Sequence, residues 1–203
     1  IGSESDTVFS GSAGTFAENP AGAFDFPLRG RLHDLCEVPG YSLRNLAEPG
    51  ALVWDRPLEA VTFVENHDVA RSAPIVHDKL MAYAFILTHE GYPCVFWQDY
   101  FNWDLARPDD ASGIAALVRV HECHAGGATR VLHADDDLYV MQREGSGGQG
   151  GLVFVLNNRG AWNGATVQTR WNSTRLVPVA WRGHDDAELR QEEQTSESGW
   201  GDF

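Results

Sequence analysis

Continuous apolar runs mark the first part of the chain, and their residue types predict buried strands. Residues 60–64 read Ala-Val-Thr-Phe-Val, which is β-prone throughout and lacks polar alternation. Such a run is typical of a parallel strand that is covered on both faces. The run Cys94-Val95-Phe96-Trp97 predicts a second buried strand, and residues 23–28 predict a buried strand end that is closed by Pro27.

Segments with helical spacing alternate with these runs. Leu32, Leu35 and Cys36 share one side of residues 29–38, and residues 41–46 predict a further short helical turn. Longer amphipathic patterns cover Val76 to Thr88 and Ile114 to Cys123. Alternating strands and helices predict βαβα units built on a parallel sheet, which is an α/β fold.

The pattern changes at Ala125-Gly126-Gly127. Beyond this point the apolar residues form short β runs at Leu138 to Gln142, Leu152 to Leu156 and Ala165 to Thr169. Turn residues separate the runs, and the Gly-rich stretch 145–151 predicts a flexible hairpin tip. We therefore expect two parts, an α/β domain over residues 1–125 and an antiparallel all-β domain over residues 126–203.

Charge and composition exclude several classes of partner. The 203 residues include 15 Lys and Arg against 29 Asp and Glu, a net charge of −14 with histidine neutral. Nucleic-acid binding needs clustered basic residues, and anionic membrane surfaces attract them, so neither is expected as a partner. No apolar run approaches the roughly 20 residues that a membrane helix needs.

The three cysteines, Cys36, Cys94 and Cys123, have no metal-ligand spacing and cannot all pair. Two of them lie in apolar or helical contexts, which favours buried free thiols.

Polar residues follow the strand at 60–64 directly, as Glu65-Asn66-His67-Asp68. In a β/α barrel, residues just past the carboxyl end of a strand point into the mouth of the active site. A carboxylate beside an imidazole at that place suits the binding of hydroxyl-rich substrates. The alternative is that these residues only cap the next helix or form a turn, and composition alone favours it.

Residues 61–68, Val-Thr-Phe-Val-Glu-Asn-His-Asp, resemble the strand-seven motif of the α-amylase family of glycoside hydrolases. Residues 23–28 resemble the strand-six segment, and residues 80–97 resemble the helix-seven to strand-eight stretch with its Gly-x-Pro. The similarity is to bacterial and plant α-amylases of the liquefying kind. It implies that residues 1–125 are the last strand–helix units of a TIM (β/α)₈ barrel. It also implies that residues 126–203 are the β-sandwich that follows the barrel, without its closing strand.

The resemblance implies retaining hydrolysis of α-1,4-glucosidic bonds in starch, glycogen or maltodextrins. Asp68 then corresponds to the carboxylate that favours the oxocarbenium-like transition state. His67 is a hydrogen-bonding neighbour on the substrate, and Asn66 helps to hold the loop. Glu65 falls where many relatives carry Asp, at a position that is not expected to be catalytic.

Retention also needs a nucleophilic carboxylate and an acid/base carboxyl group. The resemblance assigns these groups to strands four and five, before residue 23, where no Arg-x-Asp motif occurs and Glu4 is a poor candidate. We therefore expect a C-terminal portion of an amylase that is inactive by itself. The alternative is a non-catalytic carbohydrate-binding or interaction module derived from an amylase.

Aromatic residues follow the predicted strand at 94–97. Trp97 and Tyr100, with Phe101 and Trp103 nearby, are candidates for stacking on glucose rings, and packing against neighbouring loops is the alternative.

The resemblance also implies calcium. Its main site is expected outside this chain, and a second site would use Asp136, Asp137, Pro39 and Tyr41, whose oxygen atoms suit calcium. A solvated acidic turn is the alternative for the two aspartates. The family further implies an α-glucan as partner, a monomeric full-length enzyme and secretion.

Overall fold

The computed structural model describes residues 21–159, 163–180 and 192–203, and its first half is built on a small parallel sheet. The strands are β1 (Ala23–Phe24), β2 (Ala60–Phe63) and β3 (Tyr92–Cys94), with β2 in the middle. Both pairings are parallel, and the register sets Phe24 beside Val61 and Phe63 beside Cys94. The predicted parallel arrangement is therefore observed.

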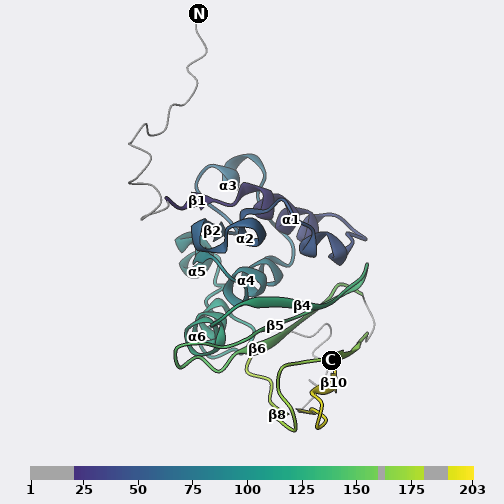
Figure 1. Cartoon of the computed structure of the whole chain (residues 1–203). Helices are drawn as coiled ribbons and strands as arrows, with labels where there is room; N and C mark the ends of the chain where they lie inside the picture. The colour runs from purple at the N-terminus through teal and green to yellow at the C-terminus, as the bar shows by residue number, and fades with distance from the viewer. Residues whose placement is uncertain (1–20, 160–162, 181–191) are drawn as a thin grey trace, which may run out of the picture.

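Helices connect and cover these strands (Figure 1). The α-helices are α1 (Phe26–Glu37), α2 (Leu52–Asp55), α3 (Val69–Ser72), α4 (Lys79–Thr88), α5 (Trp97–Phe101) and α6 (Ile114–His124). Two 3₁₀ helices, η1 (Leu43–Ala47) and η2 (Pro57–Glu59), complete the set in the described part of the chain. None of the described helices is long and apolar enough to cross a membrane.

The strand end predicted at residues 23–28 is shorter than expected and is exposed. Asp25 ends the strand because its carboxylate accepts a hydrogen bond from the Leu28 amide at 3.0 Å and caps α1. Pro27 then lies in the first turn of that helix, where its missing N–H costs nothing. Phe24 is exposed because β1 is an edge strand of the described sheet.

The second predicted strand is displaced along the sequence. Strand β3 ends at Cys94, opposite the last residue of β2, and Trp97 opens α5 instead of continuing the strand. Gly91, with a φ of +103°, lets the chain turn directly into β3. The prediction of a buried strand over Cys94–Trp97 is therefore wrong. Strand β3 does not continue past Cys94, because β2, the strand with which it pairs, ends at Phe63.

Helix α4 begins three residues later than the apolar pattern indicated. Asp78 has a φ of 42°, which is outside the helical region, and Val76 is exposed before it. Helix α6 matches the prediction closely, and its apolar side packs against α4.

The second half contains antiparallel strands. Strands β4 (Thr129–Ala134), β5 (Leu138–Arg143) and β6 (Leu152–Asn157) form one sheet with β5 in the middle. Strand β7 (Thr166–Gln168) pairs with β10 (Trp200–Asp202), and β8 (Arg175–Leu176) pairs with β9 (Glu193–Gln194). The three predicted β runs are confirmed as β5, β6 and β7, whereas β4, β8, β9 and β10 were not predicted.

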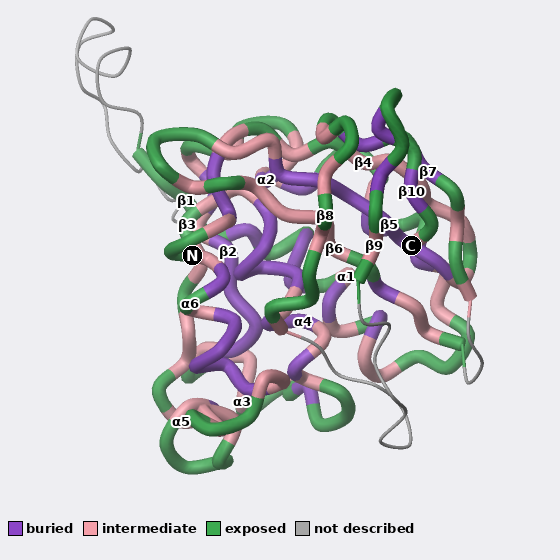
Figure 2. Tube along the Cα trace, turned by 90° about the horizontal axis from the view of Figure 1, so that it is seen from below, coloured by how far each residue is buried: buried purple, intermediate pink, exposed green. Residues whose placement is uncertain are grey.

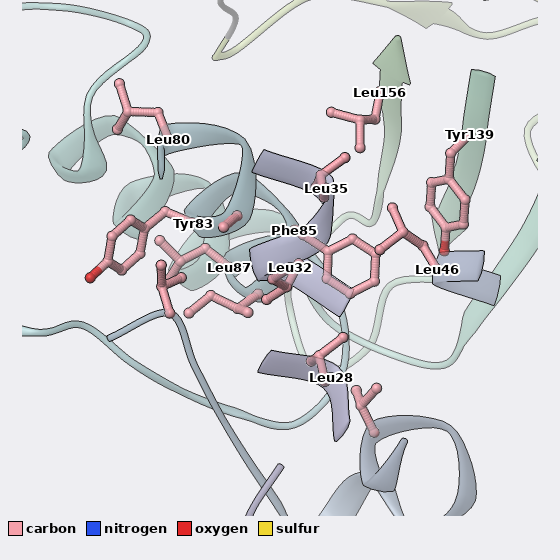
Figure 3. Packing of buried hydrophobic residues seen from close by; sticks show 14 of the residues in the cluster. Leu28, Leu32, Leu35, Leu46, Leu80, Tyr83, Phe85, Leu87, Tyr139 and Leu156 are labelled. Atoms are coloured by element: carbon pink, nitrogen blue, oxygen red, sulfur yellow. The ribbon is translucent and has the colours of Figure 1, made fainter. Parts of the chain in front are cut away.

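One hydrophobic cluster spans both halves. Figure 3 shows Leu28, Leu32 and Leu35 of α1 with Phe85 of α4, Tyr139 of β5 and Leu156 of β6. In Figure 1 the β4–β6 sheet lies beneath α4, and Figure 2 shows buried backbone running through the middle of the molecule. The change of secondary structure near residue 126 therefore does not divide the core.

The cysteines differ from expectation. All three are free, but Cys94 and Cys123 are exposed, and only Cys36 is half-buried. Burial raises the pKa of the Cys36 thiol to about 12. Cys94 is exposed because it lies on the edge strand β3.

Candidate functional site

The polar segment after β2 changes from buried to exposed within a few residues. Val64 and Glu65 are buried, whereas the side chains of His67 and Asp68 are 78% and 76% exposed. The Asn66 side-chain oxygen accepts hydrogen bonds from the Asp68 and Val69 amides, both at 2.9 Å. The Asn66 side chain thus holds the turn that leads into α3, as the alternative interpretation expected.

The capping role does not extend to Asp68. Its side chain makes no capping hydrogen bond to α3. Instead, Oδ1 lies 3.4 Å from Nε2 of His67. A carboxylate and an imidazole are therefore presented to solvent together, at the carboxyl end of a central parallel strand. This pair can contact a polar ligand without first giving up a structural role.

Glu65, directly before this loop, belongs to the interior. Its Oε1 accepts a hydrogen bond from the Ile75 amide at 2.6 Å and lies 3.4 Å from Nη2 of Arg29. Burial raises the pKa of Glu65 in spite of the nearby Lys79 and Arg29. Glu65 is therefore held inside the fold, and its absence from the catalytic residues stays an expectation of the family resemblance.

Another buried carboxylate, that of Asp99, lies in the middle of α5. Asp99 accepts hydrogen bonds from Lys79 Nζ at 2.8 Å and from the Tyr83 hydroxyl at 2.6 Å. Burial and the Asp99 charge raise the pKa of Tyr83 far above its usual value, so the phenol stays protonated. Lys79 Nζ is also 3.9 Å from Glu65. Sequence reasoning missed this network, because its charged residues are far apart in the chain.

The aromatic candidates separate into two kinds. Trp97 is 56% exposed, and Phe101 and Trp103 are exposed as well. Tyr100 is half-buried, packs against the core and meets Phe101 edge to face at 4.8 Å between ring centroids. The Trp97 ring is thus available to stack on a ligand, whereas neighbouring side chains already cover part of the Tyr100 ring. Figure 2 shows α3 and α5 at the same end of the molecule.

The residues predicted to bind calcium come together, but their oxygen atoms have protein partners. Asp136 Oδ1 accepts from the Ser42 hydroxyl at 2.7 Å, and Asp137 Oδ2 lies 2.8 Å from Arg159 Nε. The carbonyl of Tyr41 accepts from the Asn158 side chain at 2.6 Å.

Pro39, the fourth predicted ligand, is exposed. Within the residues that the structure describes, no three His, Cys, Asp or Glu side chains gather as a metal site. A guanidinium beside Asp137 and an amide beside Tyr41 would have to move before calcium could use these oxygens, and the calcium site stays a prediction of the family resemblance.

A shallow groove lies apart from these candidates. It has a volume of about 450 Å³, and its lining includes Arg130 and His133 of β4, Gln168 of β7 and Trp200 of β10. None of the predicted site residues lines it.

Comparison with known proteins identifies the family. The chain is 31% identical over 197 residues to an α-amylase of Bacillus licheniformis, an alignment that covers 89% of this chain and 36% of that protein. It is 33% identical over 129 residues to probable alpha-amylase 2 of Arabidopsis thaliana, covering 58% of this chain and 30% of that protein. The chain belongs to the α-amylase family of glycoside hydrolases.

The fold of this α-amylase family member also has solved neighbours. The crystal structure of the gamma-CGTase from alkalophilic Bacillus clarkii superposes with a TM-score of 0.64 over 89% of this chain and 30% of that chain, at 21% identity. No family model matches the chain. The chain spans about a third of the length of the relatives named above, at 30% and 36%. Glu4, the poor candidate for a further carboxylate, lies outside the described residues.

Proposed function

We propose that this chain is part of a retaining α-amylase that hydrolyses α-1,4-glucosidic bonds in starch, glycogen or maltodextrins. In this proposal Asp68 supplies the carboxylate that stabilises the transition state. The observation that carries it is the exposed His67–Asp68 pair at the carboxyl end of β2. The 31% identity to an α-amylase over 197 residues supports the choice of reaction.

The proposed reaction requires a negative charge that stabilises the transition state more strongly than the bound substrate. Positive charge develops on the sugar ring as the glycosidic bond breaks, and a nearby carboxylate favours that charge. The Asp68 carboxylate is free to do this because the Asn66 side chain accepts the amide hydrogen bond at the start of the next helix. His67, beside it, donates to or accepts from a sugar hydroxyl.

Trp97 provides the apolar counterpart of these polar contacts. A glucose ring has an apolar face that packs well on an indole, and Trp97 is exposed at the start of α5. We assign Tyr100 a smaller part, because its ring already packs against the core.

The nucleophile and the acid/base group are assigned to other strands of the parent enzyme. We take β1, β2 and β3 as the sixth, seventh and eighth strands of a (β/α)₈ barrel, and the β-rich half as the domain that follows it. The exposed Phe24 and Tyr92 on the two edge strands support this assignment, since further strands would cover them. The chain alone is then expected not to turn over starch.

Two measurements on the 203-residue chain test the proposal. The first is release of reducing ends from soluble starch, where turnover would contradict the assignment of the nucleophile elsewhere. The second is calorimetric binding of maltotetraose and of acarbose, a pseudo-oligosaccharide with a cationic nitrogen. We expect acarbose to bind more tightly, by about tenfold, which corresponds to about 1.4 kcal/mol.

The charge of Asp68 should be responsible for that preference. Asp68→Asn is expected to remove it while leaving maltotetraose binding nearly unchanged. Asp34→Asn is the matched control, because Asp34 is exposed and pairs with the adjacent His33 at 3.3 Å on α1. Equal losses in both variants would point to net charge and count against Asp68.

A non-catalytic carbohydrate-binding module remains the second candidate, and the exposed Trp97 favours it as much as the first. It predicts that acarbose and maltotetraose bind alike and that Asp68→Asn changes neither. A monomeric parent enzyme and its secretion stay predictions of the family resemblance.

A further inference from the structure

The loop that carries His67 and Asp68 is held at both ends by one side chain of α1. Arg29 Nε donates to the carbonyl of Val64 at 3.2 Å, directly before the loop. Its Nη2 donates to the carbonyl of Ala73, at the far end of the loop. Arg29 is only 6% exposed, so water competes little for these contacts.

Glu65 closes the same loop from the other side. Its Oε1 accepts from the Ile75 amide at 2.6 Å and from Arg29 Nη2 at 3.4 Å, and the residue is 3% exposed. The buried Arg29–Glu65 pair therefore fixes the chain on both sides of residues 66–74. Two backbone carbonyls and one amide are fixed by the same two side chains.

The pair also connects to α5. Lys79 Nζ lies 3.9 Å from Glu65 Oε1 and 2.8 Å from Asp99 Oδ1. Asp99 belongs to α5, whose first residue is Trp97. Two cationic and two anionic side chains thus alternate in one buried network. The network contacts both the loop that carries His67 and Asp68 and the helix α5 that carries Trp97.

Such a network is a poor way to gain stability. Desolvation of buried charges offsets most of their attraction, and a well-packed apolar pair is often as stable. Directional hydrogen bonds to the backbone, however, fix a loop in one conformation, which an apolar pair does not. The geometry therefore favours a role in orientation.

We propose that Arg29 and Glu65 are positioning residues, a buried clamp that fixes the loop bearing His67 and Asp68. Lys79 and Asp99 extend the clamp to α5. The role of the loop in sugar binding rests on the proposed function, whereas the clamp itself does not.

Amide hydrogen exchange of the full chain tests the clamp directly. The main variant is Arg29→Met/Glu65→Met, which removes both charges together and so leaves no unpaired partner in the pair. We expect only a modest fall in its melting temperature, because the backbone groups that lose their side-chain partners can reach water when the loop opens. Exchange within residues 66–75 should nevertheless accelerate by about tenfold or more, as expected when local opening becomes easier.

Two further variants keep the test informative if the double variant does not fold. Glu65→Gln keeps an acceptor for the Ile75 amide but removes the charge, and Arg29→Lys keeps the charge but loses the forked geometry. Both should accelerate loop exchange by less than the double variant. Glu90→Gln is the matched control, because Glu90 accepts one backbone amide, from Thr129 at 2.6 Å, away from this loop.

Acarbose binding separates the two proposals. If the folded double variant exchanges its loop at the wild-type rate, the clamp is overturned, whatever binds. If the wild type binds no oligosaccharide but loop exchange still accelerates in the variants, the clamp stands and the proposed function fails. If the wild type binds and the variants lose affinity together with loop protection, both are supported.

Discussion

The imidazole Nε2 of His89 lies 2.9 Å from the hydroxyl of Tyr139, and this contact joins the end of α4 to the central strand of the β4–β6 sheet. His89 Nδ1 lies 2.8 Å from the carbonyl of Phe85, and the His89 ring stacks on the Phe85 ring with centroids 3.6 Å apart. A carbonyl can only accept, so Nδ1 carries the proton and Nε2 accepts from Tyr139. This site therefore accommodates the neutral form of the His89 imidazole.

Stability should fall as the solution is acidified below the ordinary pKa of histidine. Burial lowers the pKa of His89 from 6.5 to about 3, so between these values the unfolded state binds a proton that the folded state does not. The free energy of unfolding should then decrease by about 1.4 kcal/mol for each pH unit within this window. Urea denaturation between about pH 6.5 and pH 4.5 measures the slope.

The contribution of His89 is isolated by comparison of variants. His89→Gln should reduce the pH dependence by about one proton equivalent, although it lowers stability at neutral pH. An unchanged slope in His89→Gln would mean that other groups cause the acid sensitivity.

Asp25→Ala should destabilise the fold by about 2–4 kcal/mol, because a helix cap and a charge-assisted hydrogen bond are lost together. Asp25 is buried and accepts from the Leu28 amide at 3.0 Å and from the Val53 amide at 2.7 Å. Chemical denaturation is the measurement. Asp34→Ala, on the exposed side of the same helix, should change stability by no more than about 0.5 kcal/mol. Similar values for the two variants would contradict the structural role of Asp25.

Two glycines should respond in opposite directions to the same substitution. At Gly91, with a φ of +103°, an added Cβ would lie 2.9 Å from Cγ2 of Thr62, so Gly91→Ala should cost about 1–3 kcal/mol. At Gly30, within α1, an added Cβ meets nothing within 4 Å. Gly30→Ala should therefore stabilise the protein by about 0.5–1 kcal/mol through helix propensity. Melting of both variants at equal concentration checks the opposite signs.

Calcium should have little effect on the stability of this chain. The oxygens of Tyr41 and Asp137 are engaged by Asn158 and Arg159. An ion that bound only the folded state at a hundred times its dissociation constant would add about 2.7 kcal/mol. We expect no such shift in melting temperature between calcium and a chelator. A calcium-dependent increase that Asp137→Asn abolishes would support the calcium site predicted from the sequence.

Strands and helices with a strong local signal could be predicted from the sequence. Strand β2 follows from an uninterrupted apolar run, and α6 follows from its amphipathic spacing. Boundaries set by single backbone angles could not be predicted, as Asp78 at the start of α4 illustrates. Strand β4 was missed because the register shift between Val131 and His133 interrupts its alternation.

The candidate site was predictable only at its surface. That His67 and Asp68 are exposed follows from their place after a buried strand, and the family motif singled them out. Arg29, Lys79 and Asp99 gave no signal, because charged residues at isolated positions usually face solvent. Their pairing exists only once α1, α4 and α5 are assembled around β2.

The clamp also constrains how this protein can be recombined with its homologues. Arg29 lies in one strand–helix unit, and its contacts at Val64, Glu65 and Ala73 lie in the next. A recombinant protein with its crossover anywhere in residues 38–59 would carry the arginine of one parent and the loop of the other. Libraries that shuffle whole strand–helix units would then separate the two, so the smallest exchangeable block that keeps the whole clamp around Asp68 runs from Arg29 to Asp99.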